Sequence, residues 1–380
     1  MYKKIYFYIE QKEEIIMETY GIIFGTFAPL HTGHIDLITK AKRENDHVFV
    51  VVSGYKEDRG DKINLNLQKR FRYVREAFAK DELVTVVKLD ETDMPRYPDG
   101  WTPWLNELSV ITKNFVVKDG KYYTKDLVDI DFPKIVFYVS EKEYKDELES
   151  RGFTVKYGER NFNISATKIR NNPRTYWNFL SLPFRRHFST NILIVGSASN
   201  GKTTLANDLG RFYLAPVVLE YAREYEVENN VKDDELMPKD FFHFLLGQNK
   251  NASSIIDGPT NNGLVIADTN STVTAAYYDS YIRGIDKEED LAFDKLYSSL
   301  ARKEKWSSII FVEPNGKYVD DGFRDMTMAD DEARNDFTNH LKELIKKDFP
   351  NVPTYFIGGN YLENYEKSKE IIDNLLNKEN

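Results

Sequence analysis

Residues 192–203 read ILIVGSASNGKT, an apolar run that meets a glycine-bearing turn and then a lysine and a threonine. The turn matches G-x-x-x-x-G-K-[ST] in full, from Gly196 to Thr203. Because an apolar strand precedes it and a helix is expected to follow, the match stands in the strand–loop–helix context that supports a P-loop. The stretch predicts a parallel α/β sheet with a phosphate-binding loop at a strand end.

A second stretch of the same kind lies nearer the N-terminus. Residues 20–34 read YGIIFGTFAPLHTGH, in which an apolar strand again meets a glycine-bearing turn and a predicted helix. Strand-like and helix-like segments alternate after both stretches, which is typical of parallel sheets covered by helices on both faces. The chain has 380 residues, enough for two domains. We therefore expect two α/β domains, a Rossmann-like parallel sheet over residues 18–172 and a P-loop parallel sheet over residues 191–380.

The segment 173–190 joins the two predicted domains. Pro173 and Pro183 favour a boundary here, because proline interrupts helices. The segment also carries Trp177 and Phe184, large apolar side chains of a kind that flexible linkers lack. We expect an ordered, packed linker.

Near-continuous apolar or β-branched runs mark the other expected strands, as in buried parallel sheets. These runs cover residues 47–53, 83–89, 134–140 and 154–157 in the first half and 216–219, 263–267, 307–312 and 353–357 in the second. The expected helices include residues 68–80, 204–212 and 361–376.

Composition limits the classes of function. The formal net charge of −9 disfavours general nucleic-acid binding, which needs a basic surface, so we expect no DNA partner. Cysteine is absent, which excludes disulfides and thiolate metal sites and fits a reducing compartment. No apolar run reaches the roughly 20 residues that span a bilayer, and the start of the chain lacks the pattern of a signal peptide. We expect a cytoplasmic protein with no membrane partner, and the sequence leaves a homo-oligomer open.

The P-loop implies binding of a nucleoside triphosphate. Its backbone N–H groups are expected to cradle the phosphates, with Lys202 reaching the β- and γ-phosphates and Thr203 binding Mg²⁺. Asp268 ends the apolar run of residues 264–267 and is the second candidate for Mg²⁺, or otherwise a helix N-cap. The remaining nucleotide-binding candidates in this loop are Gly196, Ser199, Asn200, Gly201 and Thr204.

A carboxylate and an arginine follow the strand of residues 216–219. Glu220 and Arg223 lie three residues apart at the carboxyl end of this strand, where ligands bind in such sheets. A kinase for a hydroxyl acceptor needs a carboxylate near that hydroxyl, so Glu220 is the first candidate for base or ribose ligand and Asp268 the second. Arg223 is a candidate substrate ligand. A plain surface ion pair between Glu220 and Arg223 is the alternative.

Two polar stretches of the first half also open predicted helices. His31 and His34 lie three residues apart and share a face, where unpaired N–H groups and two ring donors form an anion site. Gly25 allows the backbone to approach a ligand closely. Residues 164–170 read ISATKIR and bring two hydroxyls, a lysine and an arginine to a second helix start. The alternative is that both histidines are ordinary surface or capping residues.

These stretches resemble the two motifs of the nucleotidyltransferase superfamily, G-x-F-x-P-x-H-x-G-H and I-S-x-T-x-x-R. The resemblance implies that a phosphate or alcohol attacks the α-phosphorus of a nucleoside triphosphate and that pyrophosphate leaves, with Mg²⁺ assisting. By this resemblance, His31 and His34 would contact the transferred phosphoryl group, and Ser165, Thr167 and Arg170 would hold the pyrophosphate. The other nucleotide-binding candidates of this half are Gly25, Thr26, Phe27 and, near the adenine, Ser140.

The chain from about residue 18 to residue 380 resembles the NadR family of bifunctional NAD-salvage enzymes. The resemblance rests on the order of the two halves and on the runs EYAREY at 220–225, ADTN at 267–270 and VDDGFR at 319–324. It implies that the second half phosphorylates nicotinamide riboside to the mononucleotide, NMN. The first half would then join NMN to AMP, giving NAD and pyrophosphate, with ATP and Mg²⁺ used by both halves.

Three further site residues follow from this substrate. Trp101 opens a helix after the third strand, and its indole face would suit the flat, cationic pyridinium ring. Trp104 is the alternative candidate for binding this ring. The other interpretation is that both tryptophans are core residues that anchor the helix. Residues 318–324 suit a mobile lid over the phosphates, with Arg324 stabilising charge and Arg334 behind it.

The sequence leaves other functions open. Some members of the family begin with a helix-turn-helix repressor domain, but only about sixteen residues precede the first core strand here, so we do not expect direct repression. The nearest alternative is a fused adenylyltransferase and kinase of coenzyme A synthesis, which does not predict the runs at 220–225 and 319–324. The remaining alternatives are a non-catalytic sensor of pyridine nucleotides and a chain in which only one half is active.

Overall fold

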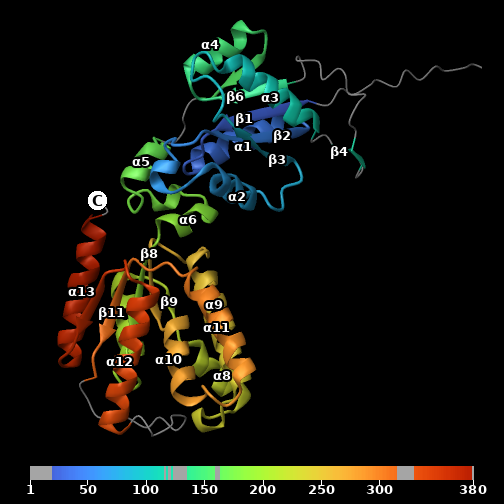
Figure 1. Cartoon of the computed structure of the whole chain (residues 1–380). Helices are drawn as coiled ribbons and strands as arrows, with labels where there is room; N and C mark the ends of the chain where they lie inside the picture. Colours follow the sequence, from blue (N-terminus) through green and yellow to red (C-terminus); the bar gives the residue numbers. More distant parts are fainter. Residues whose placement is uncertain are drawn as a thin grey trace, which may run out of the picture. The chain divides into compact units, whose positions relative to one another are not determined.

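The computed structural model describes residues 19–114, 117–118, 121–122, 135–158, 163–314 and 329–378. The chain divides into two compact units, unit 1 (Met1–Ala166) and unit 2 (Thr167–Asn380) (Figure 1). The division falls inside the helix α5 (Ala166–Asn171). Within the described residues, every helix is too short or too polar to cross a membrane.

Unit 1 is built on a five-stranded parallel sheet with the strand order β3-β2-β1-β6-β7. The predicted strands are confirmed to within one residue at each end. A short antiparallel pair of strands that the sequence did not predict, β4 with β5, also belongs to this unit. The elements of unit 1 are β1 (Tyr20–Gly25), α1 (Thr32–Glu44), β2 (His47–Gly54), η1 (Asp61–Ile63), α2 (Leu67–Ala77), β3 (Val84–Asp90), α3 (Trp101–Asn114), β4 (Val117–Lys118), β5 (Lys121–Tyr122), β6 (Ile135–Val139), α4 (Lys142–Ser150) and β7 (Thr154–Tyr157).

Unit 2 is built on a second five-stranded parallel sheet, in the order β12-β11-β8-β10-β9. Its predicted strands are also confirmed to within one residue at each end. Its elements are η3 (Trp177–Phe179), α6 (Leu182–Phe188), β8 (Thr190–Val195), α7 (Lys202–Tyr213), β9 (Val217–Val218), α8 (Tyr221–Asn229), η4 (Asp233–Glu235), α9 (Pro238–Ile256), β10 (Leu264–Asp268), α10 (Ser271–Tyr281), α11 (Lys287–Ala301), β11 (Ser308–Val312), α12 (Asp331–Asp348), β12 (Thr354–Ile357) and α13 (Tyr361–Lys378).

The sheet of unit 2 is covered on both faces, as its unbroken apolar strands require. One apolar cluster joins alternate residues of the central strands to α10 and α12, and the other joins the intervening residues to α7 and α13. A third cluster packs α8, α9, α10 and α11 against one another (Figure 1). These helices place side chains beside the carboxyl ends of β9 and β10.

The segment 173–190 packs against unit 2. Trp177 and Phe184 are buried, and the indole N–H of Trp177 donates to the Asn261 carbonyl oxygen at 2.8 Å. These two large apolar residues therefore serve as core residues of unit 2.

A buried ion pair fixes the loop between β2 and α2 in unit 1. The Arg70 guanidinium donates to both carboxylate oxygens of Asp58, at 2.8 and 2.6 Å, and the Arg70 side chain is fully buried. Burial alone would raise the pKa of the Asp58 carboxyl, but the hydrogen bonds and charge of Arg70 hold it below its ordinary value. A Cβ at Gly60 would lie 1.7 Å from Arg70 Nη1, so the loop also needs glycine there.

Replacing Arg70 by methionine is expected to lower the free energy of unfolding by about 3–5 kcal/mol, because it leaves the buried Asp58 charge unpaired. Chemical denaturation measures this loss. Since the folded-state pKa of Asp58 is lowered, the pair stabilises the protein above about pH 4, and its contribution disappears as the pH falls through the folded-state value.

Arg72→Met on the same helix is the matched control. Arg72 is largely exposed and pairs with Glu76 one turn away, so its loss is expected to cost at most about 0.5 kcal/mol. Equal losses in the two variants would contradict the role given to the buried pair.

Candidate active sites

The P-loop of unit 2 lies between β8 and α7. A Cβ at Gly196 would lie 2.4 Å from the Val312 carbonyl oxygen, so the close approach of β11 requires glycine at the start of the loop. Ser199 and Gly201 have φ values of 63° and 71°. This curvature suits a ring of inward-facing N–H groups that binds anions. Lys202 donates to the Ser197 carbonyl oxygen at 2.8 Å, so the predicted phosphate-binding lysine lies over the loop.

Thr203 and Asp268 form an oxygen-rich pair at the foot of the P-loop. The Thr203 hydroxyl donates to Asp268 Oδ2 at 2.5 Å, and Asp268 is almost fully buried as the last residue of β10. Burial raises the pKa of the Asp268 carboxyl, against the opposing effects of Lys202 and Thr203. Its second oxygen, Oδ1, is buried and has no hydrogen-bond partner within the described residues.

This oxygen pair fits Mg²⁺. A hydroxyl and a carboxylate are hard oxygen donors, and proteins commonly bind Mg²⁺ through one or two such groups plus phosphates and water. Within the described part of the chain, no three His, Cys, Asp or Glu side chains gather to hold a metal by themselves. Most ligands of the ion would therefore come from the nucleotide and water.

Glu220 lies at the carboxyl end of β9, where it is the N-cap residue of α8. Burial and the neighbouring Asp268 carboxylate raise the pKa of Glu220, while Lys202 and Arg223 lower it. The Arg223 guanidinium forms an ion pair with Glu226, one turn further along α8, at 3.0 Å. Burial and the adjacent Asp233 raise the pKa of Glu226, while Arg223 opposes them.

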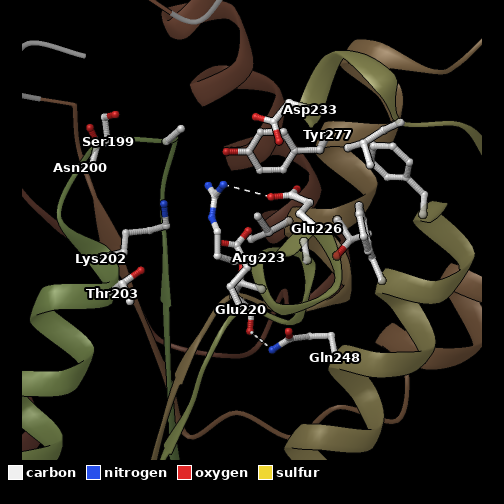
Figure 2. Close-up of a pocket in the computed structure, with 18 of the residues that line it drawn as sticks. Ser199, Asn200, Lys202, Thr203, Glu220, Arg223, Glu226, Asp233, Gln248 and Tyr277 are labelled. Atoms are coloured by element: carbon white, nitrogen blue, oxygen red, sulfur yellow. Dashed lines mark hydrogen bonds and ion pairs between the residues drawn. The ribbon is translucent and has the colours of Figure 1, made fainter. Parts of the chain in front are cut away.

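One pocket of about 190 Å³ connects these groups (Figure 2). At one end lie P-loop residues 198–204, and at the other lie acidic, apolar and aromatic side chains. The lining at that far end includes Arg223, Glu226, Asp233, Leu236, Phe241, Phe244, Tyr277 and Tyr281.

Several lining residues were missed in the sequence, among them Glu226, Asp233, Gln248, Thr269 and Tyr277. The sequence could have indicated Glu226, because it follows Arg223 by three residues, a spacing that places both on one face of a helix. Thr269 lies in the run ADTN at 267–270 but was not singled out as a site residue. The other three come from η4, α9 and α10, and no motif marks them as parts of one pocket.

The two predicted histidines of unit 1 lie together at the start of α1. His31 is the N-cap residue; its Nδ1 accepts from the Gly33 N–H at 3.2 Å, and His34 Nδ1 accepts from the His31 N–H at 3.3 Å. The two rings stack with centroids 3.7 Å apart. Because each Nδ1 accepts, a neutral ring carries its proton on Nε2, which is then the donor. Both histidines take part in a capping box, and these hydrogen bonds fix the ring nitrogens that a ligand would meet. Their contact with a phosphoryl group stays a prediction.

The second motif, residues 164–170, begins in unit 1 beside the first motif and crosses the division between the units after Ala166. A Cβ at Gly33 would lie 3.1 Å from the His31 ring and 3.6 Å from the Ile164 side chain, so Ile164 lies next to the helix start. Further along the motif, Arg170 donates to the Thr167 hydroxyl at 2.9 Å. Ser140 follows the end of β6, and Phe27 is buried with its ring in an edge-to-face contact with the His34 ring, the two centroids 5.0 Å apart.

Trp101 and Trp104 are core residues of unit 1. Each is only 6% exposed, and both pack against Phe24 and the surrounding apolar cluster. This burial favours the core-anchor alternative, and ring binding by either tryptophan stays a prediction.

The predicted lid at 318–324, with Arg324, lies outside the described residues. Arg334 is described; it is buried on α12, where it pairs with Asp331 at 2.6 Å.

The chain matches two described families, one in each half. Residues 22–172 match the cytidylyltransferase-like family, and residues 191–359 match the AAA domain family.

Relatives cover nearly the whole chain. A solved NadR protein in complex with NR is 35% identical, with a TM-score of 0.80, over 94% of this chain and 96% of that one. A solved NadR protein in complex with NAD and AMP-PNP is 34% identical, with a TM-score of 0.77, over 95% of this chain and 97% of that one. The trifunctional NAD biosynthesis/regulator protein NadR of Salmonella typhimurium is 26% identical, over 93% of this chain and 83% of its own length.

Proposed function

The chain belongs to the NadR family, and from this premise we propose that it makes NAD from nicotinamide riboside in two ATP-using steps. Unit 2 phosphorylates the 5′-hydroxyl of the riboside to give NMN and ADP. Unit 1 joins NMN to the AMP part of a second ATP, giving NAD and pyrophosphate. The relatives do not favour a coenzyme A enzyme, since their names and ligands concern NAD and nicotinamide riboside.

The pocket of unit 2 carries the proposal. It joins a P-loop to a chamber with two carboxylic side chains, Glu226 and Asp233, and two phenol rings, Tyr277 and Tyr281. The pyridinium ring of nicotinamide riboside is flat and positively charged, so the aromatic faces and the Asp233 carboxylate attract it, while the Arg223 cation of this chamber is paired with Glu226. With the ring in this chamber, the 5′-hydroxyl would point toward the P-loop.

The pocket residues supply the parts of a phosphoryl transfer. The 5′-oxygen attacks the γ-phosphorus of ATP, its new bond forms as the bond to ADP breaks, and the hydroxyl proton passes to Glu220. The raised pKa of Glu220 suits a base that must hold this proton. Lys202 offsets the negative charge on the phosphates. Thr203 and Asp268 would hold Mg²⁺, which supplies further neutralisation of that charge.

Adenylyl transfer in unit 1 needs positioning and no covalent intermediate. A phosphate oxygen of NMN attacks the α-phosphorus of ATP, and pyrophosphate leaves with the broken bond. The Nε2 donors of His31 and His34 would hydrogen-bond the phosphoryl oxygens as charge develops there. Ser165, Thr167 and Arg170 would hold the pyrophosphate.

Separate single substitutions are expected to remove the two activities one at a time. Lys202→Ala should abolish formation of NMN from the riboside and leave formation of NAD from supplied NMN unchanged. His34→Ala should do the reverse, because its donor lies in the other unit. Chromatography of the products, with each substrate supplied in turn, measures both. Loss of both activities in either folded variant would disprove the assignment of one reaction to each unit.

Glu220→Gln is expected to lower the kcat of the kinase by about 10²- to 10⁴-fold, because it removes the base. The raised pKa of Glu220 places the acidic limb of the kinase kcat/KM profile above pH 4.5, and activity rises as the pH passes through it. Glu220→Gln should remove this limb.

Two controls accompany this measurement. Glu228→Gln changes an exposed carboxylate on the same helix and should leave the profile unaltered. Adenylyl transfer uses the same nucleotide, so a limb caused by ionisation of ATP would occur in both reactions. A kinase profile that Glu220→Gln does not change would exclude Glu220 as the base.

A further inference from the structure

Thr269 is the single residue between the end of β10 and the N-cap residue of α10 in unit 2. β10 ends at Asp268, and Asn270 is already the N-cap residue of α10. This tight junction places Thr269 at φ 88°, in the left-handed region that β-branched residues rarely adopt. Glycine would adopt this conformation with little strain. A threonine here therefore indicates that the side chain itself has a use.

Hydrogen bonds on both sides hold the strained residue in place. The Thr269 N–H donates to the Ile194 carbonyl oxygen at 3.2 Å, and the Gln248 side-chain amide donates to the Thr269 carbonyl oxygen at 3.4 Å. The Gln248 amide oxygen also accepts from the Tyr221 N–H at 2.8 Å. Because Tyr221 follows Glu220, the Gln248 side chain connects Thr269 to the backbone beside the proposed base.

The register of the sheet also brings Thr269 and Glu220 to neighbouring positions. β10 pairs with β9 in parallel, with Ala267 opposite Val218. Glu220 and Thr269 follow the carboxyl ends of these two strands, and both line the same pocket. Adjacent strands lie about 4.8 Å apart, a spacing that allows one small group to contact residues at both strand ends.

The hydroxyl of Thr269 is buried, and no partner for it lies in the described part of the chain. The residue is 5% exposed and lines the pocket, and its Oγ1 has no hydrogen bond within the described residues. Burying an unpaired hydroxyl is costly, so such a group calls for a ligand that completes it.

We propose that Thr269 is a substrate-contacting residue whose hydroxyl binds the reacting hydroxyl of the riboside. The Thr269 O–H donates to a lone pair of the acceptor oxygen, while the acceptor O–H points to the Glu220 carboxylate. These two hydrogen bonds orient the remaining lone pair toward the γ-phosphorus of ATP. The inference rests on the proposed kinase function of unit 2.

The test compares Thr269→Val with Thr269→Ser. Valine keeps the shape and removes the hydroxyl, so the melting temperature should stay the same or rise, because no buried polar group is left unpaired. The kinase kcat/KM for nicotinamide riboside should fall about 10- to 100-fold, with the KM for ATP within about 2-fold of the wild type. Serine keeps the hydroxyl and should retain activity to within about 5-fold.

The folding control for unit 2 is its cooperative thermal transition followed by circular dichroism, while adenylyl transfer from supplied NMN checks unit 1 and should be unchanged in both variants. Full kinase activity in Thr269→Val, an equal loss in Thr269→Ser, or a change confined to the KM for ATP would each overturn the inference. If Thr269→Val does not fold, Thr269→Ala against Thr269→Ser makes the same comparison. A wild-type protein that forms no NMN would instead overturn the proposed function, so the two failures are distinguishable.

Discussion

In both units the carboxyl ends of five parallel strands meet at one edge, and each candidate site is assembled there. In unit 2 this alignment makes neighbours of the P-loop after β8, Glu220 after β9 and Asp268 at the end of β10, although they are far apart in sequence. The helices that follow begin at the same edge with N–H groups that lack helical partners. Anion binding and acid–base chemistry therefore share one place in the fold.

The carboxyl group of Asp58 and those of Asp268 and Glu220 differ in their hydrogen bonds and in the direction of their pKa shifts. Asp58 is held by two hydrogen bonds from Arg70, and its pKa is lowered, so it stabilises the loop after β2 as a permanent anion. Asp268 has one oxygen without a hydrogen-bond partner among the described residues, and the pKa values of Asp268 and Glu220 are raised. Carboxyl groups that resist ionisation do not stabilise the fold as Asp58 does, and metal binding and proton transfer are assigned to these two groups.

Sequence patterns predicted the strands because parallel strands buried on both faces carry unbroken apolar runs. Sequence patterns also predicted the P-loop and the histidines at the start of α1. A phosphate-binding turn between a strand and a helix needs its glycines and polar residues in a fixed order, so a short motif identifies it. The patterns did not separate the two roles of Trp101 and Trp104, since an aromatic residue at a helix start suits a core as well as a ligand. They also missed Asp233, Gln248 and Thr269, whose importance arises only when strand register and helix packing bring distant segments together.

The central claim is that two separate sites act in turn on one substrate, and the fate of the ATP phosphates tests it directly. The wild-type protein is incubated with nicotinamide riboside, Mg²⁺ and ATP that carries a radioactive γ-phosphate. We predict NAD that contains the label, together with one ADP and one pyrophosphate for each NAD formed, because the kinase step puts the γ-phosphate into NMN and the second step retains it. Formation of NAD without the label, or consumption of ATP with neither NMN nor NAD produced, would contradict the account.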